Sequence, residues 1–116
     1  MIIAVNLNAA IDTTYVIEGF SVGGIHRVGR LAALPGGKGL NVASVAHILG
    51  AKVLATGFIG GFRGEFILYK LKDMGIEADF VPVKGESRVC LSIIDPVEGT
   101  ETEIREEGPS VTPADV

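Results

Sequence analysis

Three short apolar segments alternate with two helical segments between residues 2 and 83, and this order constrains the fold more than any other feature of the chain. Residues 2–7, 52–58 and 78–83 have the short apolar character typical of strands. The order strand–helix–strand–helix–strand predicts parallel pairing with right-handed crossovers. Because residues 2–7 are nearly all apolar, we expect that strand to be buried on both faces.

The two helical segments, residues 40–49 and 64–74, have apolar residues at helical spacing, and glycines at positions 50 and 75 mark their ends. The residues expected to face the core are Val42, Val45, Ala46 and Leu49 in the first helix and Ile67, Leu68, Leu71 and Met74 in the second.

The remaining strand-like segments are residues 13–17 and 26–31, joined by a glycine-rich turn, and residues 88–94 and 102–106, joined by a hairpin loop at 95–99. Apolar residues at positions 89, 91 and 93 alternate with Arg88, Cys90 and Ser92, which predicts one wetter strand face. We expect these four strands to form a separate small sheet.

The composition limits the classes of function. A chain of 116 residues with 47% apolar residues is enough for one domain. The net charge of −4 and the scattered Lys and Arg residues argue against nucleic acid as a partner, and no apolar run approaches the roughly 20 residues of a membrane span. One cysteine allows no internal disulfide and two histidines give no zinc cluster, so we expect a cytoplasmic protein without a metal site of its own.

Residues 112–115, Thr-Pro-Ala-Asp, have the pattern of a helix start: a threonine cap, a proline at the first helical position and an acid three residues after the cap. The sequence ends within that turn, and a single exposed turn is not stable. We therefore expect this polypeptide to be cut from a longer one. A frayed polar tail is the simpler alternative.

The segment Gly36-Gly37-Lys38-Gly39-Leu40-Asn41 leads into the first helix and is the strongest candidate for a binding site. Glycines let a ligand approach the backbone, and a helix start offers free N–H groups to an anion. Lys38 adds a positive charge, and Asn41 adds a donor and an acceptor, which suits an anionic or polyhydroxylated ligand. The spacing of a Walker A loop is absent, and a purely structural turn is the alternative.

Asp12 and Arg88 are the other two candidates. Asp12 lies just past the first strand, where ligands bind in open α/β sheets, and its carboxylate could accept two hydrogen bonds from sugar hydroxyls. Arg88 opens a strand and could hold a phosphate bidentately. The structural alternatives are a turn aspartate that binds its own backbone and an arginine in a surface ion pair.

Several other features have simpler structural interpretations. Cys90 fits a packed strand thiol, and His26 and His47 have no partner pattern. The glycines of residues 57–64 lack the dinucleotide-binding spacing and predict a tight strand-to-helix turn. We expect four acidic residues to lie on a solvent-exposed face of a strand, namely Glu101, Glu103, Glu106 and Glu107.

The order of these motifs resembles the phosphofructokinase B family of ribokinase-like carbohydrate kinases. The resemblance covers essentially the whole chain. The sequence departs from the family's pattern at Ala9, where a proline is usual, and it lacks the family's Gly-Ala-Gly-Asp motif. Glu86-Ser87-Arg88-Val89-Cys90 and residues 102–109 are similar to the tagatose-6-phosphate kinase and 1-phosphofructokinase branch. The other segments that carry the resemblance are residues 7–12, 36–43, 49–50 and 57–64.

The resemblance implies an α/β fold with a ribokinase-like three-layer α/β/α core, incomplete in this chain, and a small β-sheet lid. Residues 1–116 would be the N-terminal part of the kinase domain, with lid strands within 13–33 and 86–107 and the nucleotide-binding half absent. The implied substrate-binding residues are Asp12 for sugar hydroxyls, Gly37 and Asn41 for the sugar pocket, and Lys38 and Arg88 for the phosphate that the substrate already carries.

The implied activity is ATP-dependent, Mg²⁺-assisted phosphoryl transfer to a ketohexose phosphate of the tagatose 6-phosphate or fructose 1-phosphate type, by a homodimer paired through its lids. Because the missing motif supplies the family's catalytic base, no residue here is assigned as the base, and we expect the chain alone to be inactive. The alternatives are a non-catalytic or regulatory module that binds a sugar phosphate, a dinucleotide-binding fragment, and an incomplete protein that folds only as an oligomer.

Overall fold

The computed structural model describes all of residues 1–116, which form two sheets, two α-helices and a final 3₁₀ turn. The strands are β1 (Ile2–Asn6), β2 (Ala10–Val16), β3 (Arg30–Gly36), β4 (Val53–Ile59), β5 (Glu77–Pro82), β6 (Arg88–Asp95) and β7 (Thr100–Arg105). The helices are α1 (Lys38–Ile48) and α2 (Gly61–Asp73), and the 3₁₀ turn is Pro113–Asp115.

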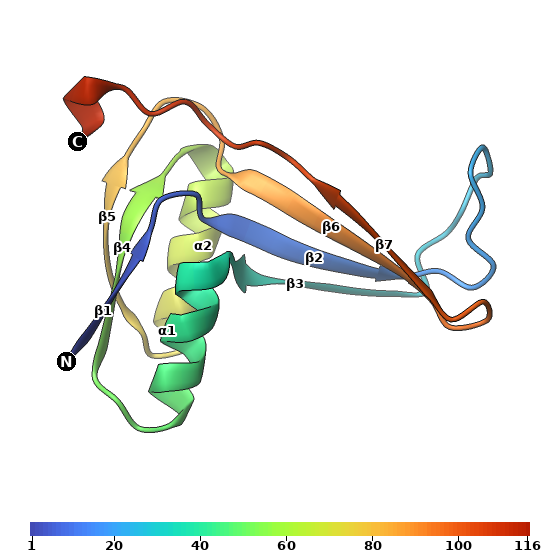
Figure 1. The fold of residues 1–116 in the computed structure, drawn as a ribbon, viewed down its shortest axis with the longest axis horizontal. Coiled ribbons are helices and arrows are strands. Elements are labelled where there is room, and N and C mark those ends of the chain that lie inside the picture. Colours follow the sequence, from blue (N-terminus) through green and yellow to red (C-terminus); the bar gives the residue numbers. More distant parts are fainter.

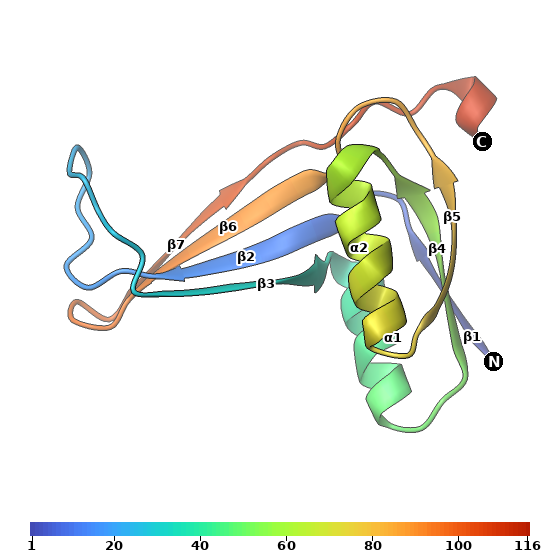
Figure 2. The ribbon, with the colours of Figure 1, turned by 180° about the vertical axis from the view of Figure 1, so that it is seen from behind.

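Strands β1, β4 and β5 form the first sheet, in that order and all parallel, as the alternation of elements predicts. Each crossover moves to the next strand in the same direction, so two right-handed crossovers place α1 and α2 on the same face. Both ribbon views show the two helices together on one side of this sheet (Figures 1 and 2). The chain has a mixed α/β structure. Of the three layers expected for the core, it contains the parallel sheet and one layer of helices.

The second face of the parallel sheet is bare, so the expectation that residues 2–7 are buried on both faces is wrong. Ile3 and Val5 are 59% and 58% exposed. Ala4 and Asn6, which alternate with them and face the helices, are buried. The continuous apolar run predicts two buried faces, but the helices of this chain cover only one.

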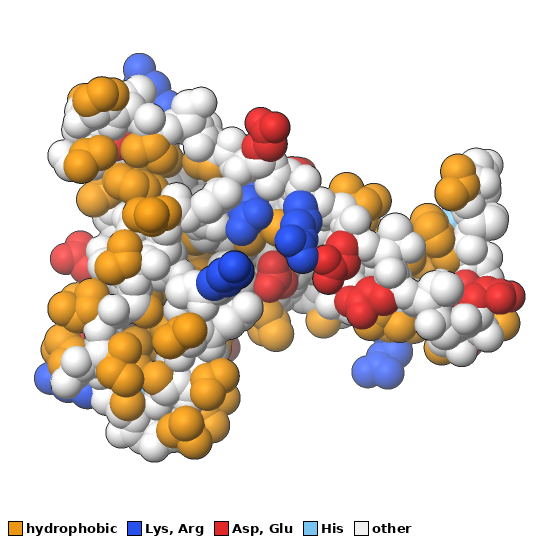
Figure 3. Space-filling view, in the orientation of Figure 1, with side chains coloured by type: hydrophobic (Ala, Val, Ile, Leu, Met, Phe, Trp, Pro, Cys, Tyr) orange, Lys and Arg blue, Asp and Glu red, His pale blue; other side chains and the backbone are white.

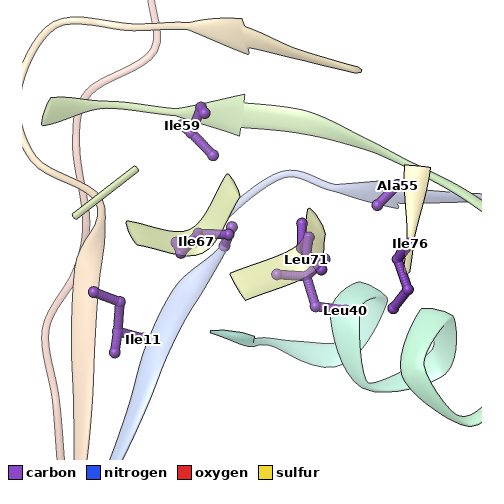
Figure 4. Packing of buried hydrophobic residues seen from close by; sticks show 8 residues of the cluster. Ile11, Leu40, Ala55, Ile59, Ile67, Leu71 and Ile76 are labelled. Atoms are coloured by element: carbon purple, nitrogen blue, oxygen red, sulfur yellow. The ribbon is translucent and has the colours of Figure 1, made fainter. Parts of the chain in front are cut away.

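The main core lies between the helices, the parallel sheet and the base of the second sheet (Figure 4). Ile67 and Leu71 of α2 are fully buried in it, which confirms the apolar stripe predicted for that helix. Ile11 joins the same cluster from β2, so the second sheet is anchored to the core at its base. The buried members of the cluster are Ala9, Ile11, Leu40, Ala55, Ile59, Ile67, Leu71 and Ile76.

The buried side of α1 matches the prediction only at Ala46, which packs against buried residues of the sheet. Leu40 and Ala43 are fully buried, whereas Val42 and Val45 are each 57% exposed and Leu49 is 80% exposed. The helix is apolar on more than one side, so its periodicity does not select the side that packs on the sheet. In the structure α1 turns its Leu40 side inward and leaves the valines open to solvent.

The separate small sheet predicted for the remaining strands is present, in the order β3-β2-β6-β7. Its central strands β2 and β6 are parallel, and the hairpin expected at residues 95–99 joins β6 to β7. The sheet projects from the α/β part as a long twisted ribbon, with residues 17–29 and 96–99 at its far end (Figure 1).

Two strands of this sheet begin elsewhere than predicted. β2 starts at Ala10 and therefore includes Asp12, and β3 is Arg30–Gly36 instead of residues 26–31. The cause is long-range pairing: β3 runs antiparallel to the whole of β2, from Ala10 opposite Gly36 to Val16 opposite Arg30. Residues 26–29 are left in the tip loop.

The chain ends in the turn that its sequence predicts. Thr112 and Asp115 form a capping box, in which the Thr112 N–H donates to the Asp115 carboxylate at 2.8 Å. Neither α-helix is long and apolar enough to cross a membrane.

Candidate functional site

A cavity of about 430 Å³ lies where the start of α1 meets one face of the second sheet. In the space-filling view, Lys and Arg side chains gather at this junction, and Asp and Glu side chains lie beside them along the sheet (Figure 3). All five residues predicted to bind substrate line the cavity, namely Asp12, Gly37, Lys38, Asn41 and Arg88. The structure therefore brings together residues that lie up to 76 positions apart in the sequence.

The start of α1 supplies backbone donors to the cavity. Gly37 is the N-cap with φ of 97°, a left-handed conformation that favours glycine and lets β3 turn into the helix. No side chain caps this end, so the N–H groups of the first turn are not satisfied by a side chain within the helix. Together with the positive end of the helix dipole, they favour an anion or a hydroxyl oxygen at this place.

Asp12 presents its carboxylate from β2 and is half-buried. The carboxylate lies directly against Gly36, where any larger residue would overlap it. Asp12 stands within a strand, which contradicts the alternative of a turn aspartate bound to its own backbone. With no ion pair in the structure, its oxygens are available to accept hydrogen bonds.

Lys38 and Arg88 are cations without a carboxylate partner. The two ion pairs of the structure are Arg63–Glu106 and Arg105–Glu103, so the surface ion pair considered for Arg88 is absent. Its Nε donates instead to the Asn8 carbonyl at 3.2 Å. Asp12, Glu101 and Glu103 also line the cavity, so the attraction for an anionic group is local to the Lys38 and Arg88 side chains, which form no ion pair.

Arg105 is a third cation at the cavity, and our sequence reasoning missed it. Cys90 lies opposite Asp12 on β2 and opposite Arg105 on β7, and it lines the cavity together with Arg88, on the wetter face predicted for β6. The hairpin loop at residues 95–99 fixes this register, so counting back from the loop would have found Arg105. Its guanidinium is held by Glu103 at 2.6 Å.

The glycine-rich turn at residues 57–64 is not open to a phosphate. The Glu86 carboxylate accepts a hydrogen bond from the Phe62 N–H at 3.1 Å and lies against Gly61, so a negative charge already stands at the start of α2. This agrees with its interpretation as a tight strand-to-helix turn, with Gly60 as the N-cap of α2.

The nucleotide and Mg²⁺ that the resemblance implies do not fit the residues present. No three His, Cys, Asp or Glu side chains stand close enough to hold a metal ion, and the start of α2 carries a carboxylate. The acidic residues of β7 instead form hydrogen bonds within the sheet, such as Ser92 to Glu101 at 2.7 Å. The arrangement can bind and orient an anionic, hydroxylated ligand.

A sequence model of the pfkB family carbohydrate kinases matches residues 5–114. Among solved structures, a possible 1-phosphofructokinase from Thermotoga maritima is 38% identical with a TM-score of 0.90, over 99% of this chain and 38% of that one. A candidate phosphofructokinase from Staphylococcus aureus is 34% identical with a TM-score of 0.89, over 99% of this chain and 37% of that one.

Phosphofructokinase-2 from Escherichia coli, solved in complex with fructose-6-phosphate, is 24% identical with a TM-score of 0.92, over 98% of this chain and 38% of that one. At this identity the similarity shows the ribokinase-like fold alone. The chain spans less than two-fifths of the length of these three proteins.

Proposed function

The chain belongs to the pfkB family of carbohydrate kinases, and we propose that it supplies the sugar-phosphate site of an enzyme that phosphorylates a hydroxyl of a phosphorylated ketohexose. Tagatose 6-phosphate and fructose 1-phosphate are the acceptors to test first. The observation that carries the proposal is the convergence of Asp12, Lys38 and Arg88 on one cavity.

Each residue has a role that follows from its chemistry. Lys38 and Arg88 hold the phosphate that the substrate brings, because both are cations without a carboxylate partner. Asp12 accepts hydrogen bonds from sugar hydroxyls, and Asn41 both donates and accepts. Gly37 lets the sugar approach the start of α1 closely. A volume of about 430 Å³ lies in the range of small-molecule sites.

The second sheet acts as a lid, and its strands lie within residues 10–36 and 88–105, so the first lid segment is longer than the expected 13–33. One of its faces lines the cavity, which supports this role. A lid that closes over the sugar excludes water, which would otherwise compete with the acceptor hydroxyl for the transferred phosphoryl group.

In the whole enzyme, ATP would supply the phosphoryl group and Mg²⁺ would neutralise its charge. Residues outside this chain hold both, since the residues present do not fit either group. The chain alone is therefore expected to show negligible kinase activity. A coupled assay for ADP release tests this, and turnover above background would refute it.

Cys90 gives a direct test of the site, because it is the single cysteine of the chain and lines the cavity. Its rate of alkylation is measured with and without fructose 1-phosphate or tagatose 6-phosphate. We expect either sugar phosphate to slow alkylation in a saturable manner, and unphosphorylated fructose and NAD to have little effect. Equal rates with and without the sugar phosphates would contradict the proposal.

We also propose that two chains pair through their lids. Val22 and Ile25 at the tip of the second sheet are 99% and 101% exposed, and Leu31 on β3 is 62% exposed. Apolar side chains exposed on a projecting sheet favour a partner surface, and a second copy of the same sheet offers one.

A further inference from the structure

Two motifs from the sequence analysis, residues 86–90 and residues 102–109, line the cavity only with Arg88, Cys90, Glu103 and Arg105. Three other residues of these motifs, Glu86, Ser87 and Glu106, form hydrogen bonds with the start of α2. We propose that Arg63 and Glu106, with Glu86 and Ser87, are positioning residues that fix the backbone of Arg88 and so aim its guanidinium at the substrate phosphate. This inference rests on the proposed function of Arg88.

Ser87, the residue before Arg88, is hydrogen-bonded to Gly60, the N-cap of α2. Ser87 is 1% exposed, and its hydroxyl accepts a hydrogen bond from the Gly60 N–H at 3.0 Å. The Ser87 N–H donates in return to the Gly60 carbonyl at 3.0 Å. Glu86 adds the bond from the Phe62 N–H described above. The segment before Arg88 is thereby joined to α2 by three hydrogen bonds.

The residue after Arg88 is held by a carboxylate. Oε1 of Glu106 accepts hydrogen bonds from the Val89 N–H at 3.0 Å and from Nη1 of Arg63 at 2.7 Å. Arg63 also donates to the Ser87 carbonyl at 3.4 Å. Arg63 and Glu106 therefore connect α2 with the residues on both sides of Arg88 and with the end of β7.

The Arg88 side chain is oriented by the same region. Its Nε donates to the Asn8 carbonyl, and the Asn8 amide donates to the Glu107 carbonyl at 2.9 Å. Neither terminal nitrogen of the Arg88 guanidinium is in an ion pair. A bidentate bond to phosphate needs this orientation, and a cation ordered before binding loses less conformational entropy when it binds.

Arg63, Glu86 and Glu106 do not line the cavity, so they can affect the phosphate only through neighbouring residues, of which Arg88 is the one that they hold on both sides. The Val89 N–H is the main cause that lowers the pKa of Glu106; burial opposes it, and the Arg63 guanidinium adds to it. Glu106 therefore stays ionised at neutral pH, and its hydrogen bonds to Arg63 and to the Val89 N–H persist there.

The test compares Glu106→Ala and Arg63→Met with Arg63→Lys and with Glu107→Ala in the full 116-residue chain. Glu107 is a neighbouring exposed acid whose side chain forms no hydrogen bond, which makes it the matched control. Calorimetry measures the affinity for fructose 1-phosphate and tagatose 6-phosphate, and hydrogen exchange measures the protection of the Val89 N–H.

We expect Glu106→Ala and Arg63→Met to weaken binding of the sugar phosphate about tenfold, as for a weakened charge-assisted hydrogen bond. Exchange at Val89 should become faster in both variants. Arg63→Lys should bind the sugar phosphate more tightly than Arg63→Met does. Glu107→Ala should have the same affinity and the same exchange rate at Val89 as the wild-type chain. Unchanged affinity together with faster exchange at Val89 would overturn the positioning role.

Arg88→Met separates this inference from the function on which it rests. If Arg88→Met weakens binding and Glu106→Ala does not, the positioning role is wrong and the proposed site stands. If Arg88→Met leaves the affinity unchanged, the proposed site fails, and the positioning role fails with it.

Discussion

The glycine at position 57 illustrates how one residue permits a sheet contact. Gly57 has φ of 139°, and a Cβ atom there would overlap the backbone carbonyl of Asn6 on the neighbouring strand β1. A larger residue would therefore force β1 and β4 apart at the last pair of their ladder.

We predict that Gly57→Ala lowers the free energy of unfolding by about 3 kcal/mol or more, because backbone strain and overlap add. Gly99→Ala is the matched control: its φ of 69° is also unfavourable, but no atom lies within 4 Å of the added carbon. Its cost should be about 1 kcal/mol. Urea denaturation measures both, and equal losses would contradict the overlap.

Asp95 ties together the two loops at the tip of the second sheet. Its carboxylate is 1% exposed and accepts hydrogen bonds from the N–H groups of Gly19, Phe20, Val97 and Glu98. Burial alone would raise the pKa of Asp95, but these four donors outweigh it and lower the pKa below 3.8. The residue thus holds residues 19–20 against the β6–β7 hairpin.

Because the pKa of Asp95 is lowered in the folded chain, its stabilising effect is present above pH 3.8 and is lost as the pH falls through the folded value. We predict that Asp95→Asn lowers the melting temperature at pH 7 and that this difference narrows below about pH 4. Glu98→Gln in the same hairpin is the control and should change little. A pH-independent difference for Asp95→Asn would contradict the argument.

At the scale of elements, α2 carries more of the core than α1. Ile67 and Leu71 are fully buried in the main cluster, and the same helix presents Tyr69, 66% exposed, to solvent. It also holds the segment around Arg88, so its position affects both the core and the cavity.

We predict that Leu71→Ala lowers the free energy of unfolding by about 2–5 kcal/mol, because it removes buried methyl groups and leaves a cavity. Tyr69→Ala, two residues away on the exposed side, should change it by less than about 0.5 kcal/mol. Chemical denaturation followed by circular dichroism checks both values. Similar losses at the two positions would mean that α2 does not pack as described.

For the whole molecule, the bare face of the parallel sheet and the tip of the second sheet are two separate apolar surfaces. The sheet face exposes Ile3 and Val5 of β1 and Val81 of β5, the last at 42%. The tip exposes Val22 and Ile25. Uncovered apolar areas of this kind favour association.

We predict that the chain associates as its concentration rises and that the two surfaces contribute differently. Ile25→Lys should abolish the lid-paired dimer in sedimentation velocity, whereas Val5→Lys should leave that dimer intact and reduce binding of a hydrophobic dye. A stable folded monomer at all concentrations in the unchanged chain would contradict lid pairing.

The sequence alone predicts the features that depend on neighbours along the chain. The alternation of strands and helices, the stripe of α2, the β6–β7 hairpin and the capping box at Thr112 all follow from local periodicity and turn chemistry. The sequence also named the candidate site residues, from glycines before a helix, an early aspartate and an arginine that opens a strand, but each had a structural alternative and their roles came from the family resemblance.

Only the tertiary structure decides which apolar surface is buried and which distant residues meet. It turns Leu40 of α1 inward instead of Val42, leaves one face of β1 open and sets β3 by its pairing with β2. It also brings Arg63 to Glu106. These outcomes depend on strand register and on contacts between segments far apart in the chain, and the free energy of such contacts does not show in any local pattern of residues.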